Sequence, residues 1–362
     1  DKQMHYNASD FVRGEVSMSL IVRPYMDENG VLRIASFERN NLKIPVEISK
    51  KSFNSMEEVE NILKLMKKET KKNHNYSSYK IEQKGVKNLV IEPSVYDKLR
   101  NGFVLEKCSI KSSKHSINED ATTILKNGNN YLLMVCDGVG GVKGGEIASN
   151  TVVDNMSKFF LTYDFSKINN TGDVVNDFAY KIKEISNELV SVFKDNPLTT
   201  LNMAIVLENE TEVFNVGDSR CYAIGNDNNI KLVTSDHSCV WYNYIKTNKL
   251  DVDDLRFTPG NNVITSSIGD FTGPKIDVYW LNNNDYKALI LCSDGVSDVL
   301  SSREIRDTVI DNKDNIANKM VGLVRSKTGY NYLDVQKCRE LFGNVDQNYV
   351  KDDDASVVVF KK

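Results

Sequence analysis

Residues 131–141 of the chain read YLLMVCDGVGG. A run of six mainly apolar residues that ends at a turn sequence is typical of a strand buried on both faces. The run stops at Asp137, and Gly138 follows it directly. We therefore expect an acidic side chain at the end of a central strand.

Acidic residues stand at the ends of other predicted strands as well. They are Asp294 after residues 288–292, Asp218 after residues 212–215, Glu119 and Asp120 before residues 121–125, and Asp353 before residues 356–360. A single Asp-Gly pair is most often only a turn former. Five acidic strand ends in one part of the chain indicate more than turns.

The chemistry of these carboxylates points to metal ions. Carboxylates buried without partners are costly, and clustered like charges are costlier still unless cations neutralise them. Oxygen ligands suit Mg²⁺ or Mn²⁺. The chain has four His and six Cys residues, none of them in a C-x-x-C pair, so a structural zinc site is not expected. A glycine after the acid, as at Gly138, would let a backbone carbonyl approach a metal closely.

Composition places the chain among ordinary globular proteins. Hydrophobic residues make up 40% and charged residues 27% of its 362 residues, which favours two domains or one domain with an appendage. The net charge of −4 gives no electrostatic footprint for nucleic acid, and no apolar stretch is long enough for a transmembrane segment. The cysteine usage suits a reducing compartment, so we predict a cytoplasmic protein. The chain begins at Asp1 without Met, as expected of a processed or shortened chain.

The first 100 residues differ in charge from the rest. They carry 18 basic and 14 acidic side chains, whereas the remainder carries 28 and 36. We expect residues 1–100 to form a small α+β accessory unit and residues 101–362 to form a second domain, with helices at 146–160 and 173–193. The elements predicted in the first unit are a hairpin within residues 11–48 with its turn at Asn29-Gly30, a helix from Ser55 to the basic residues 67–72, and a strand at residues 86–91.

Eight motifs follow one another between residues 118 and 359. They are Asn118-Glu119-Asp120; Asp137-Gly138-Val139-Gly140-Gly141 with Gly145-Glu146-Ile147-Ala148-Ser149; Thr199-Thr200-Leu201; Asn215-Val216-Gly217-Asp218-Ser219-Arg220; Asp236-His237-Ser238; Asn262-Val263-Ile264-Thr265 with Ile268-Gly269; Ser293-Asp294-Gly295-Val296-Ser297-Asp298; and Asp353-Asp354-Ala355-Ser356-Val357-Val358-Val359. In this order they resemble the metal-dependent serine/threonine protein phosphatases of the PPM (protein phosphatase 2C) family in its bacterial form. The resemblance covers about residues 103–362 and leaves the first 100 without a counterpart.

The resemblance implies an α+β fold in which two central antiparallel sheets are flanked by helices, with metals in a cleft at one end. It implies that Asp137 bridges two cations, Mn²⁺ or Mg²⁺, and that the Gly138 carbonyl, Asp294 and Asp353 complete the direct ligands. Glu119 and Asp120 would act largely through metal-bound water, and Asp218 and Asp298, with Asp294, would hold a third cation. The implied reaction is hydrolysis of phosphoserine or phosphothreonine in a phosphorylated protein substrate by a hydroxide that bridges the two cations, without a phosphoenzyme.

The chain departs from the family pattern beside these ligands. His115, with Lys114 next to it, stands where the family usually has a phosphate-binding Arg, so positive charge remains but the bidentate fork is lost. We take Asp137, Asp294, His115 and Lys114 as candidate catalytic residues. Val142, followed by Lys143, stands where a His is common, Asp354 stands where an Asn is usual, and Ser356 stands where a Thr is usual.

Other interpretations stay open at this point. The chain could be a pseudophosphatase that binds a phosphoprotein or another partner through the same fold. Residues 1–100 could instead be the main functional module, and the helix with its basic end could contact a protein partner or an anionic membrane surface, although packing against the catalytic domain is favoured. Within the segment 236–270, which resembles the family's flap, His237 is expected to help start a helix, and Arg220 is expected to be a structural ion-pair partner.

Overall fold

The computed structural model describes residues 20–26, 32–38, 41–48, 103–139, 144–168, 170–193, 197–245, 250–258, 260–328 and 352–362. Contacts along the backbone divide the chain into two compact units, Asp1–Phe103 and Val104–Lys362, which are treated separately below. Among the described residues, no helix is both long enough and apolar enough to cross a membrane.

In the first unit, the described residues form a three-stranded antiparallel sheet. Its strands are β1 (Leu20–Met26), β2 (Leu32–Glu38) and β3 (Asn41–Ile48), in that order. Met26 pairs with Leu32, so the antiparallel pairing predicted for this hairpin is confirmed. The predicted turn at Asn29-Gly30, the helix after Ser55 and the strand at 86–91 lie outside the described residues.

The described residues of the second unit contain two five-stranded antiparallel sheets. Sheet I has the order β10-β9-β12-β13-β4, and sheet II has the order β11-β8-β7-β6-β5. The strands of sheet I are β4 (Val104–Ile110), β9 (Arg220–Gly225), β10 (Ile230–Leu232), β12 (Tyr286–Cys292) and β13 (Ala355–Lys361). Those of sheet II are β5 (Ala121–Asn127), β6 (Asn130–Cys136), β7 (Leu201–Val206), β8 (Glu210–Val216) and β11 (Asp277–Asn282).

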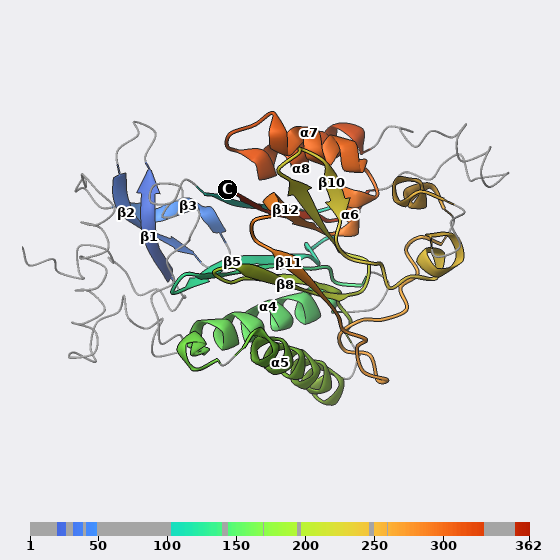
Figure 1. The fold of residues 1–362 in the computed structure, drawn as a ribbon, viewed down its shortest axis with the longest axis horizontal. Coiled ribbons are helices and arrows are strands. Elements are labelled where there is room, and N and C mark those ends of the chain that lie inside the picture. The colour runs from blue at the N-terminus through green and yellow to red at the C-terminus, as the bar shows by residue number, and fades with distance from the viewer. Residues whose placement is uncertain are drawn as a thin grey trace, which may run out of the picture. The chain divides into compact units, whose positions relative to one another are not determined.

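Helices cover the outer face of each sheet (Figure 1). Sheet II carries α4 (Gly145–Thr162), α5 (Thr171–Val192) and the short 3-10 helix η3 (Phe165–Lys167). Sheet I carries α6 (Asp294–Ser297), α7 (Ser302–Ile310) and α8 (Ile316–Lys327). The predicted sandwich of two sheets between helices, an α+β fold, is therefore confirmed, as are the strand that ends at Cys136 and both predicted helices.

Local sequence explains where α5 begins and which face it buries. The side chain of Asn170 caps the helix, and the side chain of Asp173 bonds back to the Asn170 backbone, which satisfies two otherwise free amides of the first turn. Val174, Phe178 and Ile182, together with Ile185 and Leu189, are fully buried at spacings of three and four. The same apolar stripe places Phe178 against Phe214 of sheet II.

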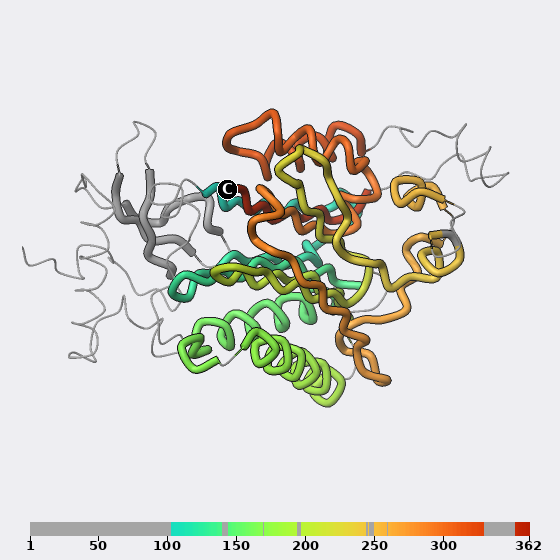
Figure 2. The backbone as a smooth tube through the Cα atoms, viewed as in Figure 1, coloured from blue at the N-terminus to red at the C-terminus, as the bar shows by residue number. Residues whose placement is uncertain are grey.

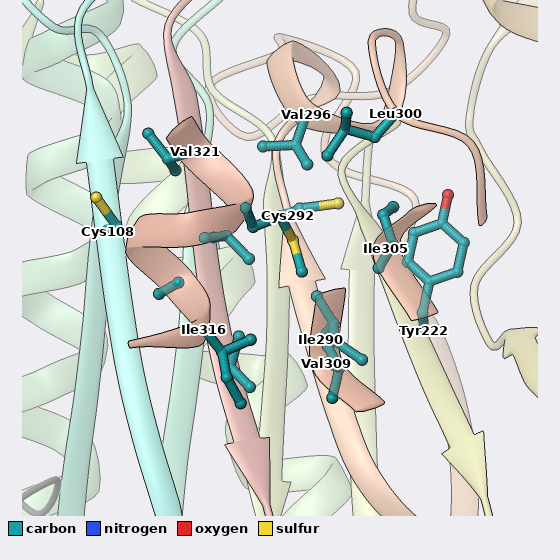
Figure 3. Close-up of a cluster of buried hydrophobic side chains, with 14 of the residues drawn as sticks. Cys108, Tyr222, Ile290, Cys292, Val296, Leu300, Ile305, Val309, Ile316 and Val321 are labelled. Atoms are coloured by element: carbon teal, nitrogen blue, oxygen red, sulfur yellow. The ribbon is translucent and has the colours of Figure 1, made fainter. Parts of the chain in front are cut away.

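A hydrophobic core joins sheet I to its helices (Figure 3). Ile305 and Val309 of α7 and Ile316 of α8 are buried against Ile290 and Cys292 of β12. The thiols of Cys136 and Cys292, at the ends of β6 and β12, have no exposed surface. Burial of such side chains contributes about 1.5–3 kcal/mol each, so this core fixes the helices firmly on the sheet.

The two ends of the second unit meet in sheet I. β4 pairs with β13 over its whole length, from Val104 opposite Lys361 to Ile110 opposite Ala355, and Figure 2 shows these teal and dark red segments side by side. The pairing brings the residues just before β13 next to the loop that follows β4. Two stretches more than 230 residues apart in sequence therefore build one end of the sandwich.

The flap-like segment is anchored through a buried ion pair. The Nη2 atom of Arg220, on β9, lies 2.7 Å from Oδ2 of Asp236, and both side chains are almost completely buried. The structural role expected for Arg220 is confirmed. The segment continues through the π-helical turn η4 (Trp241–Ile245) and the 3-10 helix η5 (Val252–Phe257).

The expectation that His237 helps to start a helix is wrong. The hydroxyl of Ser238, not the His237 ring, accepts the Trp241 amide at the start of the helical turn. The His237 ring instead contacts Gly217 and Asp277, which lie outside this segment. A ring placed beside other strands cannot also reach the amides of its own following turn.

Glu212 of β8 leads to a prediction on stability. Burial, with a smaller contribution from the charge of Glu210, raises the pKa of Glu212 to about 7. As pH rises from about 4.5 to 7, the unfolded chain loses a proton that the folded chain retains, so folding stability should fall, by no more than about 3 kcal/mol. Glu212→Gln should reduce this loss, measured as the free energy of unfolding in urea at pH 5 and pH 8. Glu208→Gln, at an exposed position, should leave the pH dependence unchanged; equal curves for wild type and Glu212→Gln would contradict the prediction.

Candidate active site

The acidic residues predicted at strand ends gather at one end of the sandwich. In sheet II, Ala121 pairs with Cys136, so Asp120 before β5 and Asp137 after β6 lie at the same edge. In sheet I, Cys292 pairs with Val357, so Asp294 and Asp353 also share an edge. Antiparallel neighbours run in opposite directions, so a residue before one strand and a residue after its neighbour must meet at the same end.

The charges of these carboxylates act on Asp137. The pKa of Asp137 is raised well above its usual range, first by burial and then by the charges of Asp120, Asp294, Asp353 and Asp218, in that order. Four of the predicted metal-site residues therefore lie near enough to Asp137 for their charges to disfavour its ionisation. Glu119 belongs to the same group, because burial and the charges of nearby acids, partly offset by His115, raise its pKa.

Asp120 connects the two sheets and carries an unsatisfied oxygen. Its Oδ2 accepts a hydrogen bond of 2.8 Å from the Ser293 hydroxyl, and the Ser293 hydroxyl accepts the Ser356 amide at 2.9 Å. Its Oδ1 is buried and has no hydrogen-bond partner within the described part of the chain. Burial is the main reason that the pKa of Asp120 rises to about 7. A buried acceptor of this kind suits a cation or a water molecule.

Two threonines fix the backbone of Asp137. The Asp137 amide donates to the Thr200 hydroxyl at 3.0 Å, and the Asp137 carbonyl accepts the Thr200 amide and the Thr199 hydroxyl, both at 2.8 Å. The Thr200 hydroxyl also bonds to the Ser219 hydroxyl at 2.8 Å. Sequence reasoning quoted the Thr199-Thr200 motif without a role for it. The structure assigns it the role of joining the turn of Asp137 to the turn of Asp218.

Glycines allow three segments to meet at this end. A Cβ atom on Gly138 would lie 2.5 Å from the Gly145 carbonyl carbon and 2.7 Å from the backbone carbonyl oxygen of Glu119. The Gly138 amide already donates a hydrogen bond to that carbonyl oxygen. A Cβ atom on Gly295 would lie 1.9 Å from the Asp354 oxygen. The reason for glycine at position 138 is therefore close backbone packing, in addition to the approach of a metal that the sequence suggested.

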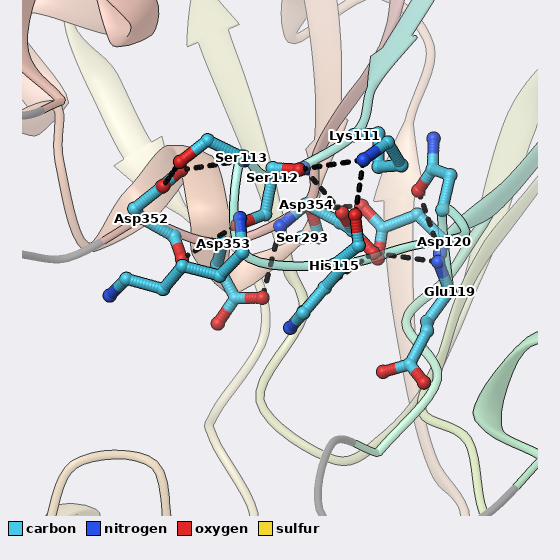
Figure 4. Close-up of polar contacts among 12 residues, drawn as sticks. Lys111, Ser112, Ser113, His115, Glu119, Asp120, Ser293, Asp352, Asp353 and Asp354 are labelled. Atoms are coloured by element: carbon cyan, nitrogen blue, oxygen red, sulfur yellow. Dashed lines mark hydrogen bonds and ion pairs between the residues drawn. The ribbon is translucent and has the colours of Figure 1, made fainter.

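Asp354 organises the loop between β4 and β5 (Figure 4). Its side chain is 2% exposed. One carboxylate oxygen accepts the Ser112 amide at 2.6 Å, and the other accepts the Glu119 amide at 2.6 Å and faces Nδ1 of His115 at 3.1 Å. Sequence reasoning recorded Asp354 only as a departure from the family pattern. Its role depends on residues about 240 positions earlier, which the sequence alone could not place beside it.

His115 and Asp354, two departures from the family pattern, thus contact each other. Burial lowers the pKa of His115, but the hydrogen bond and the charge of Asp354 outweigh this, so the pKa rises above its usual 6.5. The imidazole therefore favours its charged form more than a free histidine does. Lys114 is exposed on the same loop.

Asp298 lies at the end of α6 and is linked to the flap-like segment. The Asn261 side-chain amide donates to Asp298 at 2.6 Å. The backbone amide and the hydroxyl of Ser302, at the start of α7, both donate to Asp253 of η5, at 2.9 and 2.7 Å. These contacts attach the flap-like segment to the acidic end of sheet I.

The donor set is suited to a hard divalent cation. Every side chain of the group offers only carboxylate oxygens, and Asp120 has one buried oxygen still to be satisfied. Among the described residues, no three His, Cys, Asp or Glu side chains lie so that together they could hold a metal ion. Gly140, Gly141, Val142 and Lys143, which sequence reasoning discussed, lie outside the described residues.

Comparisons with known proteins agree with this arrangement. The family model described as protein phosphatase 2C matches residues 111–321. The serine/threonine phosphatase Stp of Listeria welshimeri is 24% identical over 59% of this chain and 85% of the relative, and the protein phosphatase PhpP of Streptococcus pneumoniae is 29% identical over 56% and 82%. The crystal structure of serine/threonine phosphatase Stp1 from Staphylococcus aureus superposes with a TM-score of 0.60 at 25% identity, over 71% of this chain and 94% of that one.

The fold, the acidic group and the family match all concern the same part of the chain. The match covers more than half of the 362 residues and includes Glu119, Asp137, Asp218, Asp294 and Asp298. The chain therefore belongs to the protein phosphatase 2C family and is a protein phosphatase.

Proposed function

We propose that this chain hydrolyses phosphoserine and phosphothreonine in protein substrates, with the help of two divalent cations, Mn²⁺ or Mg²⁺. The observation that carries the proposal is the group of mutually interacting carboxylates around Asp137 at one end of the sandwich. The relatives named serine/threonine phosphatase support the substrate class. A phosphate ester dianion is attracted to such a site only when cations outweigh the carboxylate charge.

The proposed ligands are those that the family resemblance implies, and their places at one end of the two sheets support the proposal. Asp137 would contact both cations, and Gly138, through its carbonyl, Asp294 and Asp353 would complete the direct ligands. Glu119 and Asp120 would act largely through water, and the unsatisfied Oδ1 of Asp120 supports such a role. Asp218 and Asp298, with Asp294, would hold a third cation.

The protein residues have three tasks in this reaction. When bound, the two cations supply acidification of a shared water molecule and neutralisation of the phosphate charge. Asp137 must be ionised to bind them, and the causes that raise its pKa in the folded chain, burial first, oppose that ionisation, so cation binding should weaken as the pH falls. Thr199 and Thr200 hold the Asp137 backbone in place by hydrogen bonds. These bonds keep the Asp137 carboxylate beside the other acids, although the negative charges repel one another. His115 or Lys114 supplies positive charge for the phosphate.

The metal dependence gives the decisive test of function. Asp137→Ala should lower turnover of an aryl phosphate and of a phosphothreonine peptide by more than about 100-fold at saturating Mn²⁺, because a ligand shared by both cations is lost. Steady-state rates with Mn²⁺ and with excess chelator measure the effect. Glu188→Ala, on the exposed face of α5, should behave like wild type. Wild-type turnover that is equal in chelator and in Mn²⁺ would refute the two-metal reaction, and no turnover in either would leave only the scaffold alternative.

His115 leads to a second test of the proposal. One charge-assisted contact contributes about 1–3 kcal/mol, or roughly 5–150-fold in kcat/KM. An arginine has five N–H donors in a fork, so it can pair with Asp354 and still offer donors to phosphate. His115→Arg should therefore raise kcat/KM on a small aryl phosphate at fixed pH, mainly by lowering KM.

Lys114 requires its own variant in the same assay. Lys114→Ala should lower kcat/KM if Lys114 grips phosphate in place of the missing arginine. Lys183→Ala, which removes an exposed charge on α5, is the control for net charge. Unchanged kinetics in both His115→Arg and Lys114→Ala would show that phosphate is held elsewhere.

We also propose that residues 101–362 are the catalytic domain and that residues 1–100 are an accessory unit for a protein partner. All proposed ligands lie after residue 103, and the backbone contacts separate the chain near that point. A fragment of residues 104–362 should fold cooperatively and keep kcat/KM on a small aryl phosphate within a few-fold of the full chain. An insoluble fragment that is rescued by added residues 1–100 would instead indicate one shared core.

A further inference from the structure

His237 is buried, at 2% exposure, and does not belong to the group of proposed metal ligands. Its backbone amide donates to the Gly217 carbonyl at 2.9 Å, and its ring atom Nδ1 lies 3.2 Å from the Gly217 amide nitrogen. One residue therefore bonds to both polar groups of Gly217. Gly217 directly precedes Asp218, the carboxylate between β8 and β9.

The contacts of the ring define one tautomer. The Gly217 amide can only donate, so Nδ1 must be an unprotonated acceptor. The proton of the neutral ring is then on Nε2, which lies 3.0 Å from Oδ2 of Asp277. Asp277, at the start of β11, also accepts from Lys275 at 3.0 Å, which favours its ionised form. The Nε2–H tautomer satisfies both contacts, and the Nδ1–H tautomer would satisfy neither.

The turn held by His237 has little freedom of its own. Gly217 has a φ of +98°, and a Cβ atom there would lie 2.6 Å from Cγ2 of Thr200. Thr200 is the residue whose hydroxyl accepts the Asp137 amide. The Asn215 side chain donates to the Gly217 carbonyl at 3.2 Å and to the Ser235 carbonyl at 3.0 Å. The turn that presents Asp218 is thus connected to the turn that presents Asp137.

We infer that His237 is a positioning residue for Asp218, acting as an Nε2–H imidazole whose Nδ1 holds the Gly217 amide and whose Nε2–H is oriented by Asp277. The effect on turnover rests on the proposed function, whereas the tautomer and the Gly217 contact rest on geometry alone. Asp277 acts on the site only through the imidazole. In many metal sites, a carboxylate accepts the ring N–H of a histidine and so fixes which nitrogen binds the metal. Here the histidine nitrogen fixed in this way accepts a backbone amide instead of binding a metal.

The tautomer is tested directly by ¹⁵N NMR of the full chain labelled at histidine. The chain has four histidines, and the signals that disappear in His237→Gln identify His237. At neutral pH, without metal or substrate, His237 should show the shift pattern of a neutral ring with its proton on Nε2. A protonated ring or an Nδ1–H ring would overturn the inference, whatever the enzyme does.

Two substitutions separate the two ends of the ring. In His237→Asn, the side-chain oxygen takes the place of Nδ1 and can still accept the Gly217 amide. In His237→Gln, the side-chain amide reaches the place of Nε2 and can still donate to Asp277, but the Gly217 amide loses its acceptor. Exchange of the Gly217 amide hydrogen should be faster in the Gln variant than in the Asn variant. If His237 only linked the strands, the Gly217 amide hydrogen would exchange at the same rate in both variants, or more slowly in the Gln variant.

Metal titration then connects the contact to the reaction. We expect His237→Gln to raise the Mn²⁺ concentration for half-maximal activity about 10–100-fold, the range usual for a residue that orients a ligand, and His237→Asn to stay within a few-fold of wild type. Urea midpoints of both variants check that each is folded. If the wild type is active and the two titrations coincide, the positioning role is refuted. If the wild type is inactive, the proposed function fails, while the NMR and exchange results still decide the inference.

Discussion

The fold holds several carboxylates close together at one end of the sandwich, near enough to raise the pKa of Asp137. The rest of the structure must keep these like charges in place. Their mutual repulsion and their burial both oppose folding, so the fold must compensate elsewhere. Two well-packed sheets and the core beneath α7 and α8 provide that compensation. Divalent cations would relieve the same repulsion, so the cost in stability and the proposed activity have one origin.

The backbone beneath the acids is held by small, buried polar side chains. Thr200 and Ser219 join hydroxyl to hydroxyl, and Asn202 donates both to Asn215 at 2.9 Å and to the Ser219 carbonyl at 3.2 Å. Every member is almost fully buried, although Oδ1 of Asn202 has no hydrogen-bond partner among the described residues. Hydrogen bonds in the interior are rigid because breaking one leaves a buried polar group unpaired, which is costly. Asp137 and Asp218 therefore keep their places relative to each other. His237 extends this network to β11.

The pairing of His115 with Asp354 gives the loop between β4 and β5, which is proposed to face phosphate, an unusual electrostatic character. A histidine beside a carboxylate carries at most a pair of opposite charges, whereas an arginine beside an asparagine would carry a full positive charge. An aspartate at position 354 also stabilises the loop, because its carboxylate accepts hydrogen bonds from the amides of Ser112 and Glu119. Its attraction for phosphate should be correspondingly weaker, and the cations would carry more of that task.

The sequence by itself determined the strands that end in acids, the two helices α4 and α5 and the family, because hydrophobic periodicity and motif order are local properties of the chain. The helices α6, α7 and α8 were not predicted. It also identified Arg220 correctly as an ion-pair partner. Only the tertiary structure decided that Asp354 meets His115, that Gly138 is required by the packing of Gly145, and that the His237 ring faces Gly217 instead of its own helix. Each of these depends on contacts between residues distant in sequence, which strand pairing creates and no local pattern encodes.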